Sequence, residues 1–189
     1  MSPPARGPLV LVVGPSGAGK DSLIDGARRE LGSDPGYHFV RRVVTRAAMG
    51  EDHDTLDLAA FEEAERAGAF LLSWRAHGLA YGLPIAAQDH RARGAVAVAN
   101  ASRAAIPEAR RHLTPLTIIA VTAPPEVLAA RIAGRGREDE AAARERLRGA
   151  AVALPTGSDV IRLDNDGALE TGIARFVAVL RGVRAQTIY

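Results

Sequence analysis

The sequence predicts an α/β fold in which a parallel β-sheet is covered by helices on both faces. Apolar runs near residues 9, 40, 96, 117 and 160 alternate with segments of helical periodicity. Such alternation is typical of strand–helix–strand units, which build parallel sheets. The first apolar run also leads straight into a glycine-rich loop and a helix, the context that a phosphate-binding loop requires. At 189 residues, the chain has the length of a single domain.

The predicted phosphate-binding loop lies between a strand over Leu9–Val13 and a helix over Lys20–Leu31. Its glycines let backbone N–H groups turn towards an anion, and the helix adds its positive N-terminal end. Lys20, the only lysine in the chain, is expected to reach the outer phosphates of a nucleotide as a point charge. The predicted ATP-binding residues are Gly14, Pro15, Ser16, Gly17, Ala18, Gly19, Lys20 and Asp21.

The residue after the loop lysine departs from the usual pattern, in which a serine or threonine hydroxyl binds Mg²⁺. This chain has Asp21 at that position. A carboxylate is a hard oxygen ligand, so Asp21 is the predicted Mg²⁺ residue. The alternative is that Asp21 only complements the positive end of the helix dipole. Ser22 does not replace the hydroxyl, because one helical step turns its side chain by about 100°.

The segment 34–93 carries extra strands and is predicted to be an inserted, acceptor-binding subdomain. A turn cluster at 32–36 precedes it. Asp57 as N-cap and Gly68 as terminator bracket a helix over 58–67. The other elements expected here are a strand over 37–46 that ends in basic residues, a loop over 47–57, strands over 70–74 and around Tyr81 separated by His77-Gly78, and a helix over 85–93.

The alternation of strands and helices resumes after the insert. Pro107 lies inside a predicted helix, which it either kinks or restarts. Pro124 and Pro125 open the next helix, where a missing N–H costs little. The predicted elements are strands over 95–99, 116–121 and 159–163 and helices over 102–112, 124–133, 138–151 and 169–181. The single domain, 1–189, thus consists of a core (1–33, 94–133 and 147–189), the insert (34–93) and a mobile lid rich in glycine and arginine (134–146).

Composition limits the classes of function. The chain has no cysteine, which excludes disulfides and cysteine-ligated metal sites. No apolar run approaches the roughly 20 residues of a spanning helix, and residues 1–7 form a polar leader without a signal core, so we expect a cytoplasmic protein with no membrane partner. The net charge of +2, the dispersed arginines and the 4% aromatic content argue against nucleic acid and favour a small anionic substrate. The oligomeric state has no sequence signal.

A phosphate-binding loop, an insert and a lid are the parts that a phosphoryl-transfer enzyme needs, because closure excludes water from an activated phosphate. Such enzymes act by positioning the reactants and neutralising negative charge. Arg131, Arg135 and Arg146 lie around the lid, and the first two would share a helix face at i, i+4 spacing. The alternative is that these arginines lie on a solvated helix and pair with the acidic residues of 138–145.

Several motifs resemble the guanylate kinase fold over nearly the whole chain. They are the loop 14–21, Thr45-Arg46 with Gly50-Glu51, Tyr81-Gly82, and the lid arginines, whose spacing matches residue for residue. The resemblance implies a P-loop kinase in which Arg46 and Tyr81 grip the acceptor phosphate. A second phosphate-gripping arginine of that family falls on Met49. The catalytic residues that the resemblance implies are Lys20, Arg131, Arg135 and Arg146.

The positions that read guanine in guanylate kinases differ in this chain. The family's glutamate falls on Leu72 and its serine on Leu83. Its aspartate falls on Val98, or on Asn100 if the alignment slips by two, and the run 51–61 is too short for the family's tyrosine segment. A site that hydrogen-bonds a base cannot exchange polar groups for leucine without leaving the base's polar edge unpaired. We therefore expect an acceptor other than GMP.

A narrower resemblance is to ribose 1,5-bisphosphate phosphokinases. Its motifs are Asp21 after the loop lysine, Gly50-Glu51-Asp52-His53, the run from Ser73-Trp74 through His77-Gly78 to Tyr81-Gly82, and Asn100-Ala101-Ser102-Arg103. The resemblance implies transfer of a phosphoryl group from ATP, with Mg²⁺, onto the C1 phosphate of ribose 1,5-bisphosphate. The product would be 5-phosphoribosyl 1-diphosphate (PRPP), in bacterial phosphonate breakdown.

An acceptor phosphate requires no general base, because the second pKa of a phosphate monoester is about 6. It requires cationic and hydrogen-bonding groups for two phosphates and the sugar hydroxyls. The predicted substrate-binding residues are Arg42, Arg46, Glu51, His53, His77, Tyr81, Asn100 and Arg103, with Arg75 as a further candidate. In the alternative interpretation His53 and His77 are structural, Arg42 is a strand-end charge and Glu51 is simply exposed. Trp74 is expected in the core rather than as a platform for the sugar.

Three other functions are compatible with the same residues. A nucleoside monophosphate kinase with altered base preference would phosphorylate nucleotides. A hydroxyl kinase of gluconate type would need a base, such as an aspartate, near the acceptor hydroxyl. A non-catalytic guanylate-kinase-like binding module would not need Lys20 or the lid arginines, so their presence argues against it.

Overall fold

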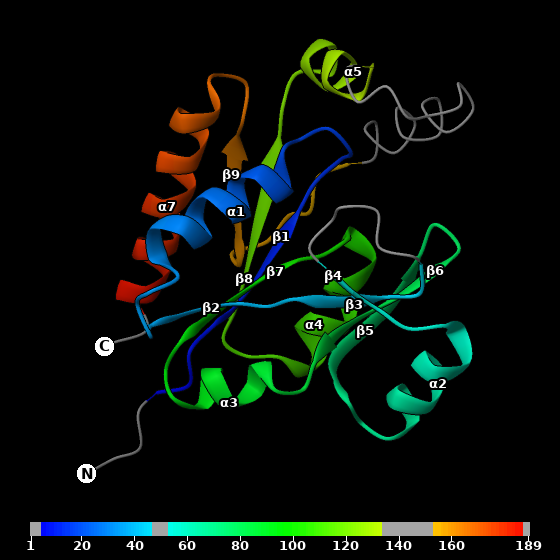
Figure 1. The fold of residues 1–189 in the computed structure, drawn as a ribbon. Coiled ribbons are helices and arrows are strands. Elements are labelled where there is room, and N and C mark those ends of the chain that lie inside the picture. The colour runs from blue at the N-terminus through cyan, green and yellow to red at the C-terminus, as the bar shows by residue number, and fades with distance from the viewer. Residues whose placement is uncertain (1–4, 47–52, 134–152, 187–189) are drawn as a thin grey trace.

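Five parallel strands form the main sheet of the computed structural model, which describes residues 5–46, 53–133 and 153–186 (Figure 1). In spatial order they are β2 (Tyr37–Phe39), β7 (Val96–Asn100), β1 (Leu9–Val13), β8 (Leu116–Thr122) and β9 (Val160–Asp164). β1 is central and pairs in parallel with β7 on one side and β8 on the other. The predicted parallel sheet is confirmed.

The apolar side chains of β1 alternate between two faces of the sheet, and all of them are fully buried. On one face they pack with α1 (Lys20–Leu31) and α7 (Leu169–Ala185). On the other face they pack with α3 (Ala87–Ala92) and α4 (Ile106–His112). The prediction that helices cover both faces is therefore confirmed.

The helices agree closely with their sequence signals. α1 begins and ends at the predicted residues. Pro107 restarts its helix: a 3₁₀ turn, η1 (Arg103–Ala105), comes first, and the proline then occupies the first turn of α4. α5 (Pro125–Ala133) opens at the second of its two prolines, whereas α3 is shorter than the helix predicted over 85–93. None of the helices in the described ranges is long and apolar enough to cross a membrane.

The β-branched pattern of 37–46 predicted a single strand, but the structure has two strands there. β2 belongs to the main sheet, whereas β3 (Arg42–Val44) belongs to a second sheet. The backbone N–H of Val40 still donates to the carbonyl oxygen of Val98 in the main sheet at 2.8 Å, and the chain then crosses. A β-branched run indicates extended backbone but not which sheet it joins. The predicted insert, 34–93, thus begins with a strand of the main sheet.

The second sheet has the described strand order β4-β3-β6-β5. β4 (His53–Thr55) pairs in parallel with β3, although the sequence predicted only a loop there because the segment has no apolar pattern. β5 (Phe70–Ala76) and β6 (Leu79–Pro84) form an antiparallel hairpin. α2 (Leu58–Arg66) contacts β5, and Asp57 caps it as predicted by accepting a backbone N–H at 2.8 Å.

Two histidine rings stack in parallel beside the main sheet. His38 of β2 and His90 of α3 have ring centroids 3.7 Å apart. Burial lowers the pKa of His38, and the nearby charges of His90 and Arg93 add to this effect. The folded state therefore binds this proton less readily than the unfolded state. As a result, the free energy of unfolding should fall as the pH drops below about 6.5, the usual pKa of histidine.

His38→Phe should reduce this loss of stability at acid pH, because phenylalanine keeps the ring stack but does not titrate. Urea unfolding of the wild type and the variant near pH 7.5 and near pH 5.5, on either side of the usual histidine pKa, measures the difference. We expect the wild type to lose more stability than the variant between the two conditions. Equal losses would show that His38 does not couple folding to pH.

Candidate active site

The glycine loop connects β1 to α1 at the carboxyl edge of the main sheet. Gly14, Gly17 and Gly19 have positive φ angles of 151°, 81° and 86°. A Cβ atom on Gly14 would lie 2.2 Å from the carbonyl oxygen of Val121 in β8. Backbone conformation and the close approach of β8 therefore both require glycine at the start of the loop. The loop ends at the N-terminus of α1, where backbone N–H groups favour an anion.

Lys20 is the first residue of α1, and its side chain folds back along the loop. Its Nζ donates hydrogen bonds to the carbonyl oxygens of Gly14, at 2.9 Å, and of Pro15, at 3.0 Å. The ammonium group is therefore held beside the loop in a half-buried position. This location agrees with a role in binding nucleotide phosphates, which stays a prediction.

Asp21 and Asn100 are in direct contact. Asn100 Nδ2 donates a hydrogen bond to Asp21 Oδ1 at 2.5 Å. Asn100 is the last residue of β7 and lies beside Val12 of β1 in the parallel register. Pairing of these two strands thus brings Asn100 to the first turn of α1. The predicted metal residue and a predicted substrate residue share one location.

A buried asparagine, Asn165, connects the loop to α5. It directly follows β9 and is 3% exposed. The side-chain Nδ2 of Asn165 donates to the carbonyl oxygen of Ala18 at 2.8 Å. The backbone carbonyl oxygen of Asn165 accepts a hydrogen bond from Arg131 Nη1 at 2.9 Å. Arg131, predicted to be catalytic, is therefore anchored beside the loop. Sequence reasoning missed Asn165, although an amide at the carboxyl end of a parallel strand is a signal for a site residue.

Arg42, Tyr81 and Trp74 lie together on the second sheet. The guanidinium carbon of Arg42 is 5.9 Å from the centroid of the Tyr81 ring. The Tyr81 ring stacks on Trp74, with centroids 5.3 Å apart and an angle of 5° between the rings. Trp74 is 6% exposed and packs in the cluster shared with the main sheet, in agreement with the prediction that it is a core residue. Two predicted substrate residues are thus neighbours.

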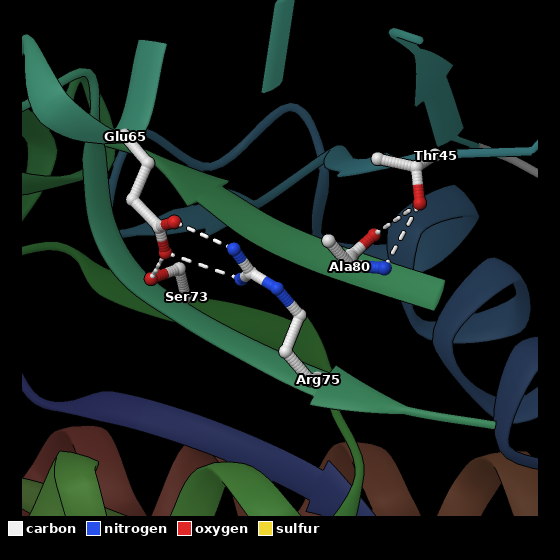
Figure 2. A network of polar contacts seen from close by, with 5 residues as sticks. All are labelled: Thr45, Glu65, Ser73, Arg75 and Ala80. Carbon is white, nitrogen blue, oxygen red and sulfur yellow. Dashed lines mark hydrogen bonds and ion pairs between the residues drawn. The ribbon is translucent and has the colours of Figure 1, made fainter. Parts of the chain in front are cut away.

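Thr45 fixes the end of β3 beside β6. Its Oγ1 accepts a hydrogen bond from the backbone N–H of Ala80 at 2.9 Å, and its hydroxyl donates to the carbonyl oxygen of Ala80 at 3.5 Å (Figure 2). Thr45 precedes Arg46 and Ala80 precedes Tyr81. This contact therefore ties the residue before Arg46 to the residue before Tyr81, and the register places Tyr81 opposite Val44.

The other described substrate candidates lie in three different places. His53 is 1% exposed and begins β4, opposite Arg42 in the register. Arg103 begins η1, just beyond β7, and burial lowers its pKa. His77 is exposed and forms the two-residue turn of the β5–β6 hairpin with Gly78; their φ angles are 51° and 72°, as a type I′ turn requires. The turn accounts for the His-Gly pair and supports the structural interpretation of His77.

Arg75 pairs with α2 and does not join the Arg42–Tyr81 group. Its guanidinium donates to both carboxylate oxygens of Glu65, at 3.2 and 2.6 Å, and Ser73 Oγ donates to the same carboxylate at 2.5 Å (Figure 2). The hydrogen bonds from Arg75 and Ser73 lower the pKa of Glu65. Because side chains alternate along a strand, Arg75 lies on the face opposite Trp74. Its role is therefore to join α2 to β5.

Leu72 and Leu83 occupy the positions that read guanine in guanylate kinases. They lie opposite each other on β5 and β6, and they are 4% and 0% exposed. Both belong to the cluster that packs on the main sheet, and so does the neighbouring Trp74. Val98, one of the two candidates for the third such position, is also fully buried, whereas the other, Asn100, ends β7. Leu72 and Leu83 therefore offer apolar packing and no hydrogen bond to a base.

Some of the predicted features lie outside the residues that the structure describes. They are Glu51, Met49, Arg135, Arg146, the lid over 134–146 and the helix over 138–151. Their roles stay predictions.

The whole chain is similar to known proteins. A family model described as an AAA domain matches residues 9–153. Ribose 1,5-bisphosphate phosphokinase PhnN from Agrobacterium fabrum is 43% identical over 175 residues, which cover 92% of this chain and 96% of that protein. The protein of the same name from Methylobacterium radiotolerans is 49% identical over 178 residues, which cover 93% of this chain and 98% of that protein.

Among solved structures, guanylate kinase from Anaplasma phagocytophilum matches with a TM-score of 0.65, over 98% of this chain and 89% of that chain. Its sequence identity is only 19%, so this match shows the fold alone. The expected P-loop α/β fold is confirmed. Because of the family match and the identity over almost the whole of both chains, the chain belongs to the AAA domain family and to the ribose 1,5-bisphosphate phosphokinases.

Proposed function

We propose that the protein transfers a phosphoryl group from ATP onto the C1 phosphate of ribose 1,5-bisphosphate and so forms PRPP. Family membership supports the reaction, because the relatives are named for this acceptor. The observation that carries the choice of acceptor is the burial of Leu72 and Leu83. A nucleobase at this position would find no polar partner, whereas a sugar phosphate has no base to accommodate.

The loop, Lys20 and Arg131 form the proposed ATP-binding part of the site. Backbone N–H groups of the loop and the Lys20 ammonium would hold the outer phosphates. Asp21 suits Mg²⁺, because proteins often hold this ion through one or two carboxylates together with substrate phosphates, and Asp21 is exposed in the first turn of α1. The bound ion would neutralise phosphate charge. Arg131, anchored beside the loop, would do the same for the transferred group, together with Arg135 and Arg146.

The second sheet forms the acceptor side. Arg42 and Tyr81 lie on the adjacent strands β3 and β6, and Arg46 follows β3. Together they supply two cations and a hydroxyl, which suits the phosphates of the acceptor. The C1 phosphate is already largely ionised at neutral pH, so the reaction needs positioning and charge neutralisation rather than a general base. Glu51, His53, His77, Asn100 and Arg103 stay predictions for the sugar and its second phosphate.

Release of ADP with ribose 1,5-bisphosphate, GMP and gluconate in parallel tests the proposal. Of the three acceptors, we expect only ribose 1,5-bisphosphate to support release of ADP, and mass spectrometry should identify the product as PRPP. Turnover with GMP but not with the ribose bisphosphate would overturn the proposal in favour of a nucleoside monophosphate kinase. Binding of ATP without turnover of any acceptor, unchanged by Lys20→Ala, would instead favour a binding module.

A further inference from the structure

Asp21 and Asn100 reverse the pair of side chains that most phosphate-binding loops use for Mg²⁺. The usual pair is a hydroxyl after the loop lysine and a carboxylate from a Walker-B aspartate. In this chain the carboxylate follows the lysine, and a neutral amide ends β7, the strand beside β1. We propose that the two positions have exchanged roles: Asp21 is the metal-facing carboxylate, and Asn100 is the positioning residue that orients it. The proposal rests on the proposed function only for the binding of Mg²⁺ with ATP.

The hydrogen bond between the two side chains is the first support. Asn100 Nδ2 donates to Asp21 Oδ1 at 2.5 Å, and a carboxylate is a stronger acceptor than a neutral group. The end of β7 is fixed at the same place, because the backbone N–H of Ala101 donates to the carbonyl oxygen of Val12 at 3.0 Å. One oxygen of Asp21 is thus held by a rigid strand end. The other carboxylate oxygen is left for a cation.

The orientation of the Asn100 amide is the second support. Its Oδ1 is buried and accepts no hydrogen bond from the described part of the chain. A buried acceptor without a partner is unfavourable, so packing does not explain an asparagine at this position. The bond to Asp21 does explain it, because a flipped amide would bring two oxygens together. Asp21 therefore determines how the amide lies.

The exchange also conserves charge. A hydroxyl with a carboxylate carries one negative charge, and so does a carboxylate with an amide. Only the donor and the acceptor of the connecting hydrogen bond change sides. The double variant Asp21→Thr with Asn100→Asp would therefore recreate the usual pair, whereas each single variant would leave either no carboxylate or two.

Calorimetry tests this exchange in the wild type, Asp21→Thr, Asn100→Asp and the double variant. Each protein is titrated with ATP, once in the presence of Mg²⁺ and once in EDTA. Each single variant should weaken the gain in ATP affinity that Mg²⁺ provides by about tenfold or more, a common loss when a group that orients a metal ligand is removed. The double variant should recover this gain to within about threefold of the wild type, because the two effects are coupled. Thermal unfolding checks that all four proteins fold.

Asp25→Asn is a matched control, because it removes another carboxylate from α1, one that pairs with Arg28 at 3.3 Å. It should leave the Mg²⁺ dependence unchanged. A double variant as weak as the weaker single variant would overturn the exchange. So would an Asn100→Asp variant in which Mg²⁺ raises the ATP affinity as much as it does in the wild type. Because no acceptor is present in this measurement, a protein with a different acceptor would still show the rescue, so the two proposals fail separately.

Discussion

Replacing Lys20 with alanine should lower kcat by at least about 100-fold with saturating ATP and ribose 1,5-bisphosphate, the usual loss when one charge-stabilising donor is removed. Phosphoryl transfer depends on positioning and on neutralising phosphate charge. The Lys20 ammonium is held at the loop by the carbonyl oxygens of Gly14 and Pro15, and the chain has no other lysine. Steady-state release of ADP, with each substrate varied in turn, measures the effect.

Lys20→Arg is the matched variant for this prediction. It keeps the positive charge, but a planar guanidinium does not reproduce the geometry of a compact ammonium on a flexible stem. We therefore expect an activity between those of the alanine variant and the wild type. Thermal unfolding should show that both variants are folded. An alanine variant with wild-type kcat and wild-type ATP affinity would show that this loop does not hold the phosphates.

The part of the fold around the loop could be predicted almost residue by residue, because its signals are local. A continuous apolar run, a glycine cluster and a helical pattern define β1, the loop and α1. β4 could not be predicted, because it depends on distant partners. Arg41, at the crossing between the sheets, pairs with Asp54 at 2.9 Å and donates to the carbonyl oxygen of His53 at 3.3 Å. The sequence of 53–55 contains no local pattern that predicts these contacts.

The residues of the candidate site were easier to predict than their contacts. Asp21 and Asn100 both stand out in the sequence, but for separate roles, and only the parallel pairing of β1 with β7 brings them together. Asn165 directly follows a parallel strand, which is a signal for a site residue, but nothing in the sequence indicates its partner, a backbone oxygen 147 positions away. Motifs thus indicate which chemistry is present, whereas the sheet order decides which groups act on one another.

Replacing Gly19 with alanine should destabilise the fold and weaken ATP binding together. Its φ is +86°, and a Cβ there would lie 2.5 Å from Asn165 Nδ2 and 3.9 Å from Arg131 Nη1. The left-handed conformation costs a residue with a side chain about 1–2 kcal/mol, and loss of the bond from Asn165 to Ala18 adds about 1 kcal/mol. Denaturant unfolding should therefore show a free energy of unfolding lower by about 2–3 kcal/mol. ATP affinity should fall because the strained loop no longer holds its backbone N–H groups towards the phosphates.

Gly68→Ala separates backbone strain from the clash with Asn165. Gly68 has a φ of +73°, and a Cβ there would meet no atom within 4 Å, so this variant should lose only the conformational cost of about 1–2 kcal/mol. In an Asn165→Ala background the clash is absent, and Gly19→Ala should then cost no more than Gly68→Ala. Unfolding and ATP calorimetry of these variants measure the coupling between the two sites. If Gly19→Ala costs no more than Gly68→Ala even with Asn165 present, then the side chain of Asn165 does not support the loop.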